Sequence, residues 1–455
     1  MSSYIPTLYL LRGAPGCGKS TAARAVFDAA DIISTDALRM MYTPVVPDIE
    51  GAPSLRVGQR GHKRMAQMLE QIVTARIDAC MTTVLDSTDS TKGHPQLVQR
   101  ALDMGMRVRH LNLQGQMTNA ELVEMQEARR GSLSHVAPEV VERMADSIRS
   151  TQRHGEILLD HDPQAAAWQV RDIYTRDHLL VPTDLQAEGY DKVMVVGDVQ
   201  SCATELQSLV NAHDDSQTFW IFVGDLFDRG PDAAGVWHAF TGIPAGRRVL
   251  VRGNHERNML LLLADTARLT ALRKGEAPEN PTESSWLQLK AAGIKHLALQ
   301  QGLAGSVLTF AFTLGDDHTR VVTHAGITGS VLDDIAIPDG AVAMTHRGRP
   351  ISGTALMYGS GSRTSTYNAR GDYDHDTIAH LAPTDLTQYH GHRNGNRQQT
   401  PQAADTHERL FTCEASVESG GHLPVVLHQR RGDQWSTDVL GVTGATITQQ
   451  SELLG

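Results

Sequence analysis

The sequence predicts two α/β domains in tandem. Short apolar segments that fit strands alternate with longer helical stretches along most of the chain, a pattern typical of parallel sheets covered by crossover helices. The chain has 455 residues, which is more than one hydrophobic core usually supports. We expect one domain over residues 1–175, a linker over the polar stretch 176–190, and a second domain over residues 191–455.

The first domain is predicted to contain a parallel sheet with flanking helices. Its first strand, Leu8–Leu11, leads into a glycine-rich turn. Pro138 stands where proline is tolerated, in the first turn of a helix. The other predicted strands are Asp31–Ser34, Thr83–Leu85 and Arg107–Leu113, and the helices are Ser20–Ala30, Lys63–Ala79, Asn119–Arg130 and Glu139–Arg149.

The second domain is predicted to contain more strands than helices. Two helical stretches, Leu260–Lys274 and Trp286–Gln300, are inserted between its third and fourth strands. Residues 340–376 are rich in Gly, Ser, Thr and Arg and have weak periodicity, so we predict loops there. The predicted strands are Val193–Val196, Trp220–Val223, Val249–Val251, Val307–Phe312, Val321–His324, Leu410–Cys413 and Val425–His428.

Composition narrows the functional classes. The chain is 40% hydrophobic and 20% charged, as in ordinary globular proteins. Its net charge of −11 argues against bulk nucleic-acid binding but allows a local groove for a strand end. Its four cysteines are far apart, so neither a disulfide framework nor a zinc knuckle is expected. No segment fits a signal peptide or membrane span, which predicts a cytoplasmic protein without a membrane partner.

The segment Gly13–Ser20 matches the phosphate-loop pattern G-x-x-x-x-G-K-[ST] between a strand and a helix. Glycines let the backbone wrap phosphates, and the helix N-terminus adds positive potential. Lys19 would reach the β- and γ-phosphates, while Ser20 or Thr21 would supply a hydroxyl to Mg²⁺. A plain glycine-rich turn is the alternative. The predicted residues for binding ATP or another NTP are Gly13, Gly16, Gly18, Lys19, Ser20 and Thr21.

Polar residues after two later strands suggest an acceptor site. Asp36 and Arg39 lie one helical turn apart after the second strand. A carboxylate there can accept a proton from an attacking hydroxyl, and an arginine can orient a substrate phosphate. Asp86 and Thr88 follow the third strand and reach the same sheet edge, where ligands bind in open α/β sheets. Asp36 could instead be a helix cap.

Together these motifs resemble the kinase domain of polynucleotide kinases that phosphorylate 5′-OH ends, over roughly residues 7–150. The family's D-x-T-N-like segment corresponds to residues 86–89, with Asp89 in place of Asn. The resemblance implies that Asp36 is the general base and that Arg39 holds the acceptor's 3′-phosphate side. It also implies that Arg129 or Arg130 steadies the transferring phosphoryl group from a lid.

Five short segments of the second half carry metal-ligating residue types. They are Gly197–Gln200, Gly224–Gly230, Gly253–Glu256, Thr323–Gly326 and Gly391–His392. The first four each end a strand, so we expect their polar side chains to meet at one edge of a sheet. Carboxylate, amide and imidazole ligands suit a pair of Mn²⁺- or Fe-like ions, and a shared Asp can bridge two such ions.

This series resembles the binuclear metallophosphoesterases of the phosphoprotein-phosphatase type, which carry GD-x-HG, GD-x-x-DRG, GNHE, H-A-G and GH. The resemblance implies an α/β metallophosphoesterase sandwich after a P-loop NTPase domain, and two ions, Mn²⁺ first, with Ni²⁺ or Fe as alternatives. One ion would take Asp198, Asp225 and His324, and the other Asp225, Asn254 and His392, with the division of the histidines left open. His255 would be the general acid, held by Asp228, and Arg229 would bind the phosphate.

Gln200 departs from this pattern, because the family has His at that position. An amide oxygen is a poorer ligand for a transition metal than imidazole, so we expect a weaker first metal site. Three outcomes stay open: retained activity with a higher metal demand, a shifted preference between monoesters and diesters, or a domain that only binds.

The fusion implies an enzyme that heals nucleic-acid ends. The domain order is similar to that of bacterial and bacteriophage polynucleotide kinase-phosphatases of RNA repair, which phosphorylate 5′-OH ends and clear 3′-phosphate or 2′,3′-cyclic phosphate ends. Partners would be RNA or DNA ends and a separate ligase, because no K-x-D-G motif is present. Oligomeric state, a homodimer included, stays open. One alternative is a small-molecule kinase fused to a protein or dinucleoside-polyphosphate phosphatase, against which the arginines of residues 347–370 argue mildly. The other is an active kinase with a non-catalytic binding module.

Overall fold

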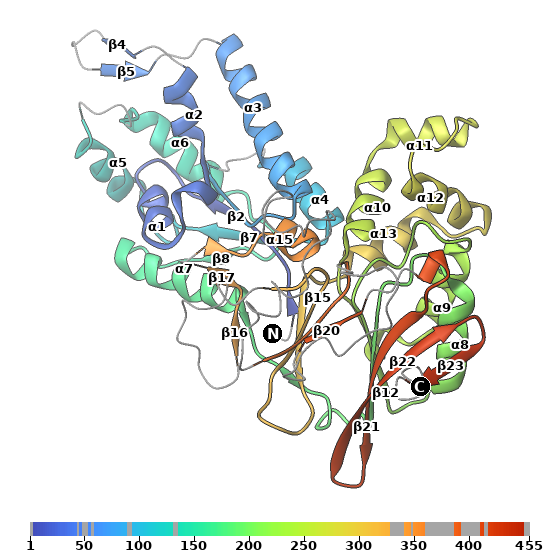
Figure 1. The fold of residues 1–455 in the computed structure, drawn as a ribbon. Helices are drawn as coiled ribbons and strands as arrows, with labels where there is room; N and C mark the ends of the chain where they lie inside the picture. Colours follow the sequence, from blue (N-terminus) through green and yellow to red (C-terminus); the bar gives the residue numbers. More distant parts are fainter. Residues whose placement is uncertain are drawn as a thin grey trace, which may run out of the picture. The chain divides into compact units, whose positions relative to one another are not determined.

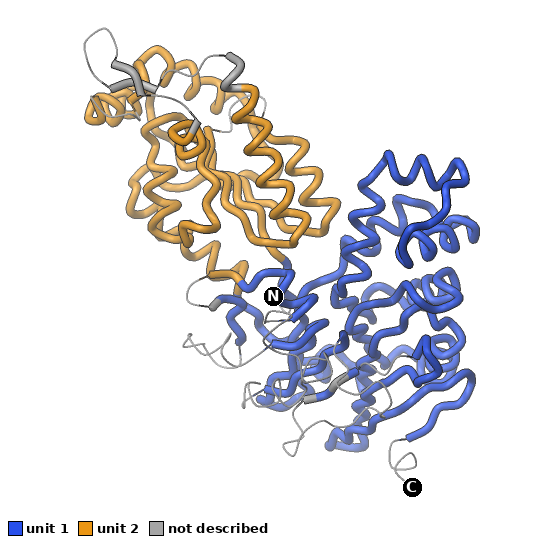
Figure 2. The backbone as a smooth tube through the Cα atoms, turned by 45° about the horizontal axis from the view of Figure 1, so that its top comes forward, with its two compact units in different colours: residues 1–5, 179–347, 351–455 blue, residues 6–178, 348–350 orange. Residues whose placement is uncertain are grey.

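The computed structural model describes residues 3–42, 45–47, 53–55, 59–88, 93–130, 135–327, 341–346, 349–359, 386–392, 410–413 and 417–449. The chain forms two compact units (Figure 2). One unit comprises residues 6–178 and 348–350, and we call it the P-loop unit. The other comprises residues 1–5, 179–347 and 351–455, and we call it the phosphoesterase unit after the family that its sequence motifs resemble. The expected α/β fold class is confirmed.

The P-loop unit is built on a five-stranded parallel sheet of order β3-β6-β2-β7-β8. The central strand β2 is buried at every residue, as expected when helices cover both faces of a parallel sheet. The strands are β2 (Thr7–Arg12), β3 (Ile32–Ser34), β6 (Thr83–Asp86), β7 (Arg107–Asn112) and β8 (Ile157–Leu158), with a separate hairpin of β4 (Val45–Pro47) and β5 (Pro53–Leu55).

Seven helices accompany this sheet among the described residues (Figure 1). Tyr9 and Leu11 of β2 belong to one core cluster with side chains of α1, α5, α6 and α7. Helices α3 and α4 contact each other and the strands β6 and β7. The helices are α1 (Lys19–Val26), α2 (Thr35–Tyr42), α3 (Gln59–Asp78), α4 (Pro95–Asp103), α5 (Asn119–Glu127), α6 (Pro138–Arg149) and α7 (Pro163–Asp177).

Two sheets form the phosphoesterase unit. One has the order β13-β12-β11-β21-β22-β23, and the other has the order β1-β14-β15-β19-β20, with β10 paired to β14. Their strands share one apolar cluster, which includes Val195, Ile221, Phe312 and Tyr389. The strands are β1 (Ser3–Tyr4), β9 (Leu179–Leu180), β10 (Thr183–Asp184), β11 (Lys192–Val196), β12 (Thr218–Phe222), β13 (Arg248–Leu250), β14 (Thr309–Thr313), β15 (Arg320–Thr323), β16 (Val342–Ala343), β17 (Thr345–His346), β18 (Arg349–Pro350, counted with the P-loop unit), β19 (Thr387–His390), β20 (Leu410–Thr412), β21 (Leu423–Arg431), β22 (Gln434–Thr443) and β23 (Thr446–Gln449).

The helices of this unit fall into two groups. Helices α8 (Ala203–His213) and α9 (Ala233–Gly242) pack against each other, and α8 also contacts β22 and β23. The predicted insertion between the third and fourth strands is a run of four helices: α10 (Asn254–Ala264), α11 (Thr266–Arg273), α12 (Pro281–Ala291) and α13 (His296–Ala304). No helix within the described residues is long and apolar enough to cross a bilayer.

Two expectations need correction. Residues 340–376 were expected to be loops, but Gly353–Tyr358 forms helix α15, which Ser352 caps by accepting the Ala355 N–H at 3.2 Å. Residues 360–376 lie outside the described part of the chain. The strands that carry the metal-ligand motifs were expected to share one sheet edge. Instead β15 pairs with β14 and β19 in the second sheet, so both sheets supply the site.

Candidate active sites

The phosphate loop lies between β2 and α1, as its sequence requires. Gly13, Gly16 and Gly18 have φ values of 149°, 98° and 89°, a region that L side chains rarely adopt. At Gly16 an added Cβ would also lie 3.1 Å from the carbonyl oxygen of Leu122. All three positions therefore need glycine for conformational reasons, and Gly13 and Gly16 need it for space as well.

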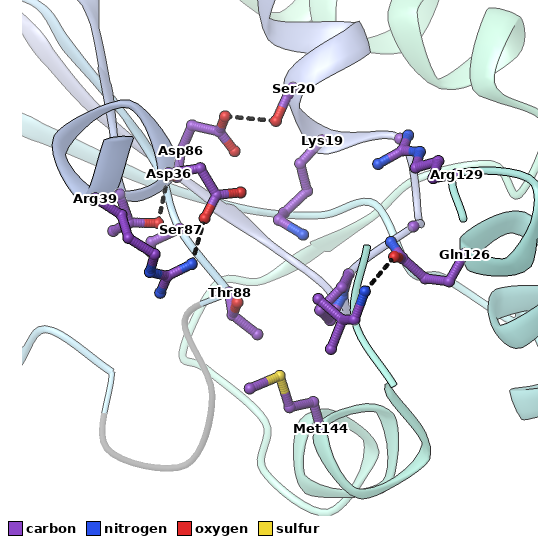
Figure 3. A pocket seen from close by; sticks show the side chains of 15 residues that line it. Lys19, Ser20, Asp36, Arg39, Asp86, Ser87, Thr88, Gln126, Arg129 and Met144 are labelled. Carbon is purple, nitrogen blue, oxygen red and sulfur yellow. Dashed lines mark hydrogen bonds and ion pairs between the residues drawn. The ribbon is translucent and has the colours of Figure 1, made fainter. Parts of the chain in front are cut away.

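Lys19 and Ser20 make the defining contacts of the loop. The Lys19 ammonium donates to the carbonyl oxygens of Gly13 at 2.8 Å and Ala14 at 3.0 Å, which holds it over the loop. The Ser20 hydroxyl donates to Asp86 Oδ2 at 2.7 Å (Figure 3). This pair places a carboxylate beside the hydroxyl that was predicted to face Mg²⁺, whereas sequence reasoning had assigned Asp86 to the acceptor. Thr21, the alternative hydroxyl, is exposed and does not line the pocket.

One pocket brings the predicted nucleotide and acceptor residues together. Arg129 lines it, whereas Arg130 is not in the lining and pairs with Glu127 at 3.1 Å. Asp89 lies outside the described residues. The pocket lining comprises Pro15, Gly16, Gly18, Lys19, Ser20, Thr35, Asp36, Arg39, Asp86, Ser87, Thr88, Gln126, Arg129, Val136 and Met144.

Asp36 and Arg39 form an exposed ion pair in this lining. Arg39 Nη1 lies 2.7 Å from Asp36 Oδ1, and the side chains are 34% and 58% exposed respectively. The first turn of α2 has another capping group, because the Ala37 N–H donates to Ser34 Oγ at 3.4 Å. The Asp36 carboxylate therefore orients Arg39 while remaining accessible to a substrate.

The phosphoesterase site has an unusual backbone. Gln200, Asp225, Asp228, Arg229 and His392 all have positive φ values, between 48° and 76°. Such angles are uncommon for residues other than glycine and are costly unless the surroundings enforce them. Five predicted site residues thus share the same rare conformation, which the strand-end turns impose.

Asp225, His324 and His392 form a cluster whose potential ligand atoms all lie within 4.8 Å of one another. His324 Nδ1 donates to the Val223 carbonyl oxygen at 2.9 Å, which directs Nε2 into the site. Nε2 lies 3.3 Å from Asp225 Oδ1 and 3.2 Å from Asn254 Oδ1. This geometry brings His324 close to His392 and Asn254, and the resemblance had left the division of the two histidines between the ions open.

Asp198 and Gln200 also contact this cluster. Asp198 Oδ2 accepts the His392 N–H at 3.0 Å, and a Cβ on Gly391 would collide with Asp198 Oδ1. Gln200 Nε2 donates to Asp225 Oδ2 at 3.2 Å. The Gln200 side-chain oxygen is buried and has no hydrogen-bond partner among the described residues.

These donors fit divalent metal ions. The three-residue cluster supplies carboxylate and imidazole ligands within a space that suits one transition-metal ion. Asp198, Asp225 and the unsatisfied oxygen of Gln200 offer only oxygen donors for a second ion. Oxygen donors alone suit a harder and more weakly held ion, so the two positions are chemically unequal.

His255 is held by two carboxylates. Its Nδ1 donates to Asp228 Oδ2 at 2.5 Å, and its Nε2 lies 3.3 Å from Asp225 Oδ2. Burial lowers the pKa of His255, but Asp225 and Asp228 outweigh this effect and raise the pKa to about 9. The imidazolium form, which can donate a proton, is thereby favoured in this arrangement.

The inserted helix α12 holds Asp228 in place. Thr282 Oγ1 donates to Asp228 Oδ2 at 2.7 Å, and the Asp228 N–H donates to Ser285 Oγ at 3.1 Å. The insertion thus supports the site, a role that the sequence did not reveal. Arg229 is half-exposed and lies 3.7 Å from Glu418, so it can reach a substrate.

Glu256 is a further site residue that sequence reasoning missed. Its carboxylate accepts the N–H groups of Asp225, Leu226 and Gly253, each at 2.8 Å. Burial raises its pKa, followed by the nearby Asp225. Glu256 joins two strand-end turns, and its place directly after His255 in the GNHE motif was the available signal. His390 is buried and contacts the Gly391 carbonyl through Nδ1 at 3.0 Å, outside the ligand cluster.

Comparisons with known proteins match both halves. Residues 8–151 match the model of an AAA domain, and residues 191–380 match that of the calcineurin-like phosphoesterases. The symmetrical bis(5′-nucleosyl)-tetraphosphatase of Legionella pneumophila (strain Corby) is 37% identical over 71 residues, which are 15% of this chain and 25% of the relative. Serine/threonine-protein phosphatase 1 of Salmonella typhimurium is 35% identical over 78 residues, 17% of this chain and 35% of the relative.

The chain thus spans about a quarter to a third of the length of these curated relatives. Among solved structures, the Pnkp1/Rnl/Hen1 RNA repair complex includes a similar chain, at 15% identity and a TM-score of 0.28 over 58% of this chain and 86% of that one. The two family matches show a P-loop, kinase-like AAA domain over residues 8–151 followed by a calcineurin-like phosphoesterase domain over residues 191–380.

Proposed function

We propose that this protein heals the ends of broken RNA strands. Its AAA domain would phosphorylate 5′-OH ends with ATP, and its phosphoesterase domain would remove 3′-phosphate or 2′,3′-cyclic phosphate. The observation that carries the proposal is one pocket whose lining includes both the phosphate loop and the exposed Asp36–Arg39 pair. A hydroxyl acceptor and the γ-phosphate can meet there.

In the kinase reaction, the Lys19 ammonium would neutralise charge on the nucleotide phosphates. The Asp36 carboxylate would accept the proton of the 5′-OH, and Arg39 would hold the neighbouring phosphate of the strand. Arg129, rather than Arg130, would contact the transferring phosphoryl group, because only Arg129 lines the pocket. Ser20 and Asp86 would hold Mg²⁺, which would supply positive charge to the nucleotide phosphates.

In the phosphoesterase reaction, metal ions such as Mn²⁺ would bind the scissile phosphate and activate water when present. Asp225, Asn254, His324 and His392 would hold one ion, and Asp198, Asp225 and Gln200 the other. His255 Nε2 would give a proton to the leaving oxygen while Asp228 keeps its ring in place. Arg229 would orient the phosphate.

A second candidate is hydrolysis of dinucleoside polyphosphates by the phosphoesterase domain. The tetraphosphatase relative favours it, although the similarity covers only 15% of this chain. The AAA domain would then act on a small molecule.

One substrate tests the proposal. The full chain is supplied with ATP, Mg²⁺, Mn²⁺ and an RNA that carries 5′-OH and 2′,3′-cyclic phosphate ends, and both termini are analysed. We expect 5′-phosphate and 3′-OH ends. A DNA strand of the same sequence, treated in the same way, shows whether RNA or DNA is the preferred substrate. Unchanged RNA ends combined with rapid hydrolysis of diadenosine tetraphosphate would favour the second candidate.

A further inference from the structure

Gln126 is a buried amide in the nucleotide pocket. It is the penultimate residue of α5, is 1% exposed, and lines the pocket. Its Oε1 accepts the Val136 N–H at 3.1 Å. Because a backbone N–H can only donate, this bond defines which end of the amide is the oxygen.

The other end of the amide is the nitrogen Nε2. No acceptor among the described residues lies within hydrogen-bond distance of Gln126 Nε2. This nitrogen faces the middle of the phosphate loop, since a Cβ built on Gly16 would lie 3.3 Å from it. Figure 3 shows the Gln126 side chain beside the loop, with Arg129 from the same part of the chain and Lys19 across the pocket.

A second buried glutamine at the same loop behaves differently. Gln114 accepts the Ala14 N–H through Oε1 at 3.1 Å and donates to the Ala145 carbonyl oxygen through Nε2 at 3.2 Å. Both ends of the Gln114 amide therefore have hydrogen-bond partners within the protein, so its burial needs no ligand. Buried donors are nearly always paired in folded proteins, so the end of Gln126 that has no partner among the described residues is suited to bind a ligand.

We propose that Gln126 Nε2 donates a hydrogen bond to a phosphate oxygen of the bound nucleotide. The inference rests on the proposed nucleotide-dependent function and adds a contact to it. A phosphate wrapped by the loop would present anionic oxygens on the side that Nε2 faces, and a hydrogen bond to an anion is stronger than one between neutral groups. Because the Val136 N–H holds Gln126 Oε1 in place, the Nε2 donor is oriented before the nucleotide binds.

Three variants of the full chain test this contact by calorimetric titration with ATP and with ADP. Gln126→Glu keeps an acceptor for Val136 but replaces the donor with a carboxylate oxygen, so we expect ATP to bind about 10- to 100-fold more weakly. Gln126→Met removes the donor without adding charge and should weaken binding about 10-fold. Gln99→Glu, an exposed position on α4 outside the pocket, introduces the same charge and should bind ATP like the wild type.

Kinetics separate a ligand contact from a structural role. The contact predicts a raised KM for ATP with kcat nearly unchanged in both Gln126 variants. A loss confined to ATP assigns the γ-phosphate as the acceptor, and a loss shared with ADP assigns the α- or β-phosphate. If both Gln126 variants bind ATP as tightly as the wild type, the proposal is wrong. If the wild type binds no ATP and Lys19→Ala changes nothing, the nucleotide site itself fails, and the kinase assignment with it.

Discussion

The two sites differ in how deeply their polar side chains are buried. Asp225 and His324 of the phosphoesterase site are 1% and 0% exposed. Asp225 accepts the His255 N–H, and His324 Nδ1 donates to the Val223 carbonyl oxygen. The side chain of Asp36 in the kinase pocket is 58% exposed and contacts Arg39. Buried ligands are oriented before an ion arrives, which suits a small ligand of fixed geometry. An exposed pair can adjust to a long polymeric acceptor.

The two sites also differ in backbone strain. The phosphate loop has glycine at its left-handed positions, so the conformation there carries little strain. The phosphoesterase turns need side chains at such positions, and Asp225 and Asp228 adopt φ values of 51° and 76°. Each costs on the order of 1–3 kcal/mol. The surrounding hydrogen bonds, such as those from Glu256 and α12, offset this cost.

The largest effect should come from the buried site. His255→Asn removes the proposed proton donor, so hydrolysis of p-nitrophenyl phosphate with Mn²⁺ should fall about 10²- to 10⁴-fold. Phosphorylation of 5′-OH RNA should be unchanged. His238→Asn, at an exposed histidine of the same unit, is the control. If His255→Asn lost both activities, the variant would be misfolded, and the prediction that the two sites act independently would fail.

In the exposed pocket, Asp36→Asn should lower kcat for 5′ phosphorylation about 100-fold, because the amide cannot accept the acceptor's proton. Asp146→Asn provides a matched control, since Asp146 forms an equally exposed ion pair with Arg149 three residues on. Rates are measured with labelled ATP and a 5′-OH oligonucleotide. Equal rates for Asp36→Asn and the wild type would show that the pair only stabilises α2.

Acid should destabilise the P-loop unit through His178. Burial is the largest influence and lowers the pKa of His178 to about 4 from an ordinary value of 6.5. The unfolded chain therefore binds the extra proton between pH 6.5 and about 4. The unfolding free energy contributed by His178 is complete above this window and falls by roughly 3 kcal/mol as the pH drops through it.

Hydrogen exchange of the P-loop unit at pH 7 and pH 4.5 measures this dependence. His178→Gln cannot take up the proton, so its stability should change less between the two pH values. His154→Gln, whose side chain is exposed, should retain the full dependence. An identical pH dependence in His178→Gln and the wild type would contradict the assignment.

The smallest effect concerns the unequal metal positions. Gln200→His supplies imidazole beside Asp198 and Asp225, so the weaker ion should bind about 10-fold more tightly. Mn²⁺ titration and the metal content after dialysis measure the change directly, independently of turnover. Gln207→His on the exposed face of α8 is the control. Unchanged stoichiometry and affinity in Gln200→His would show that Gln200 does not limit metal occupancy.

Much of the local structure was predictable. The phosphate loop, its strand and its helix follow from a contiguous motif, and the metal-ligand residues follow strands whose apolar character is evident. Helix α7 was missed, although Ala166, Val170 and Tyr174 are among its buried residues and recur every four positions. That spacing was a usable signal.

Contacts distant in sequence were not predictable. The Ser20–Asp86 pair, the support of Asp228 by α12, and the unpaired end of Gln126 depend on segments that periodicity does not connect. Residues 1–5 precede the phosphate-loop strand, yet β1 pairs with β14, with Tyr4 opposite Thr309. Strand pairing reflects the burial and backbone hydrogen bonds of the whole sheet, which no local pattern specifies.

The amino-acid sequence by itself determined the fold class, the phosphate loop and the identity of the metal-ligating residue types, because each is written in a short continuous segment. Only the tertiary structure decided which sheet supplies each ligand, which hydroxyl faces Asp86, and which arginine lines the pocket. These contacts depend on which segments lie next to each other once the core has packed, and the sequence of each segment alone does not specify this.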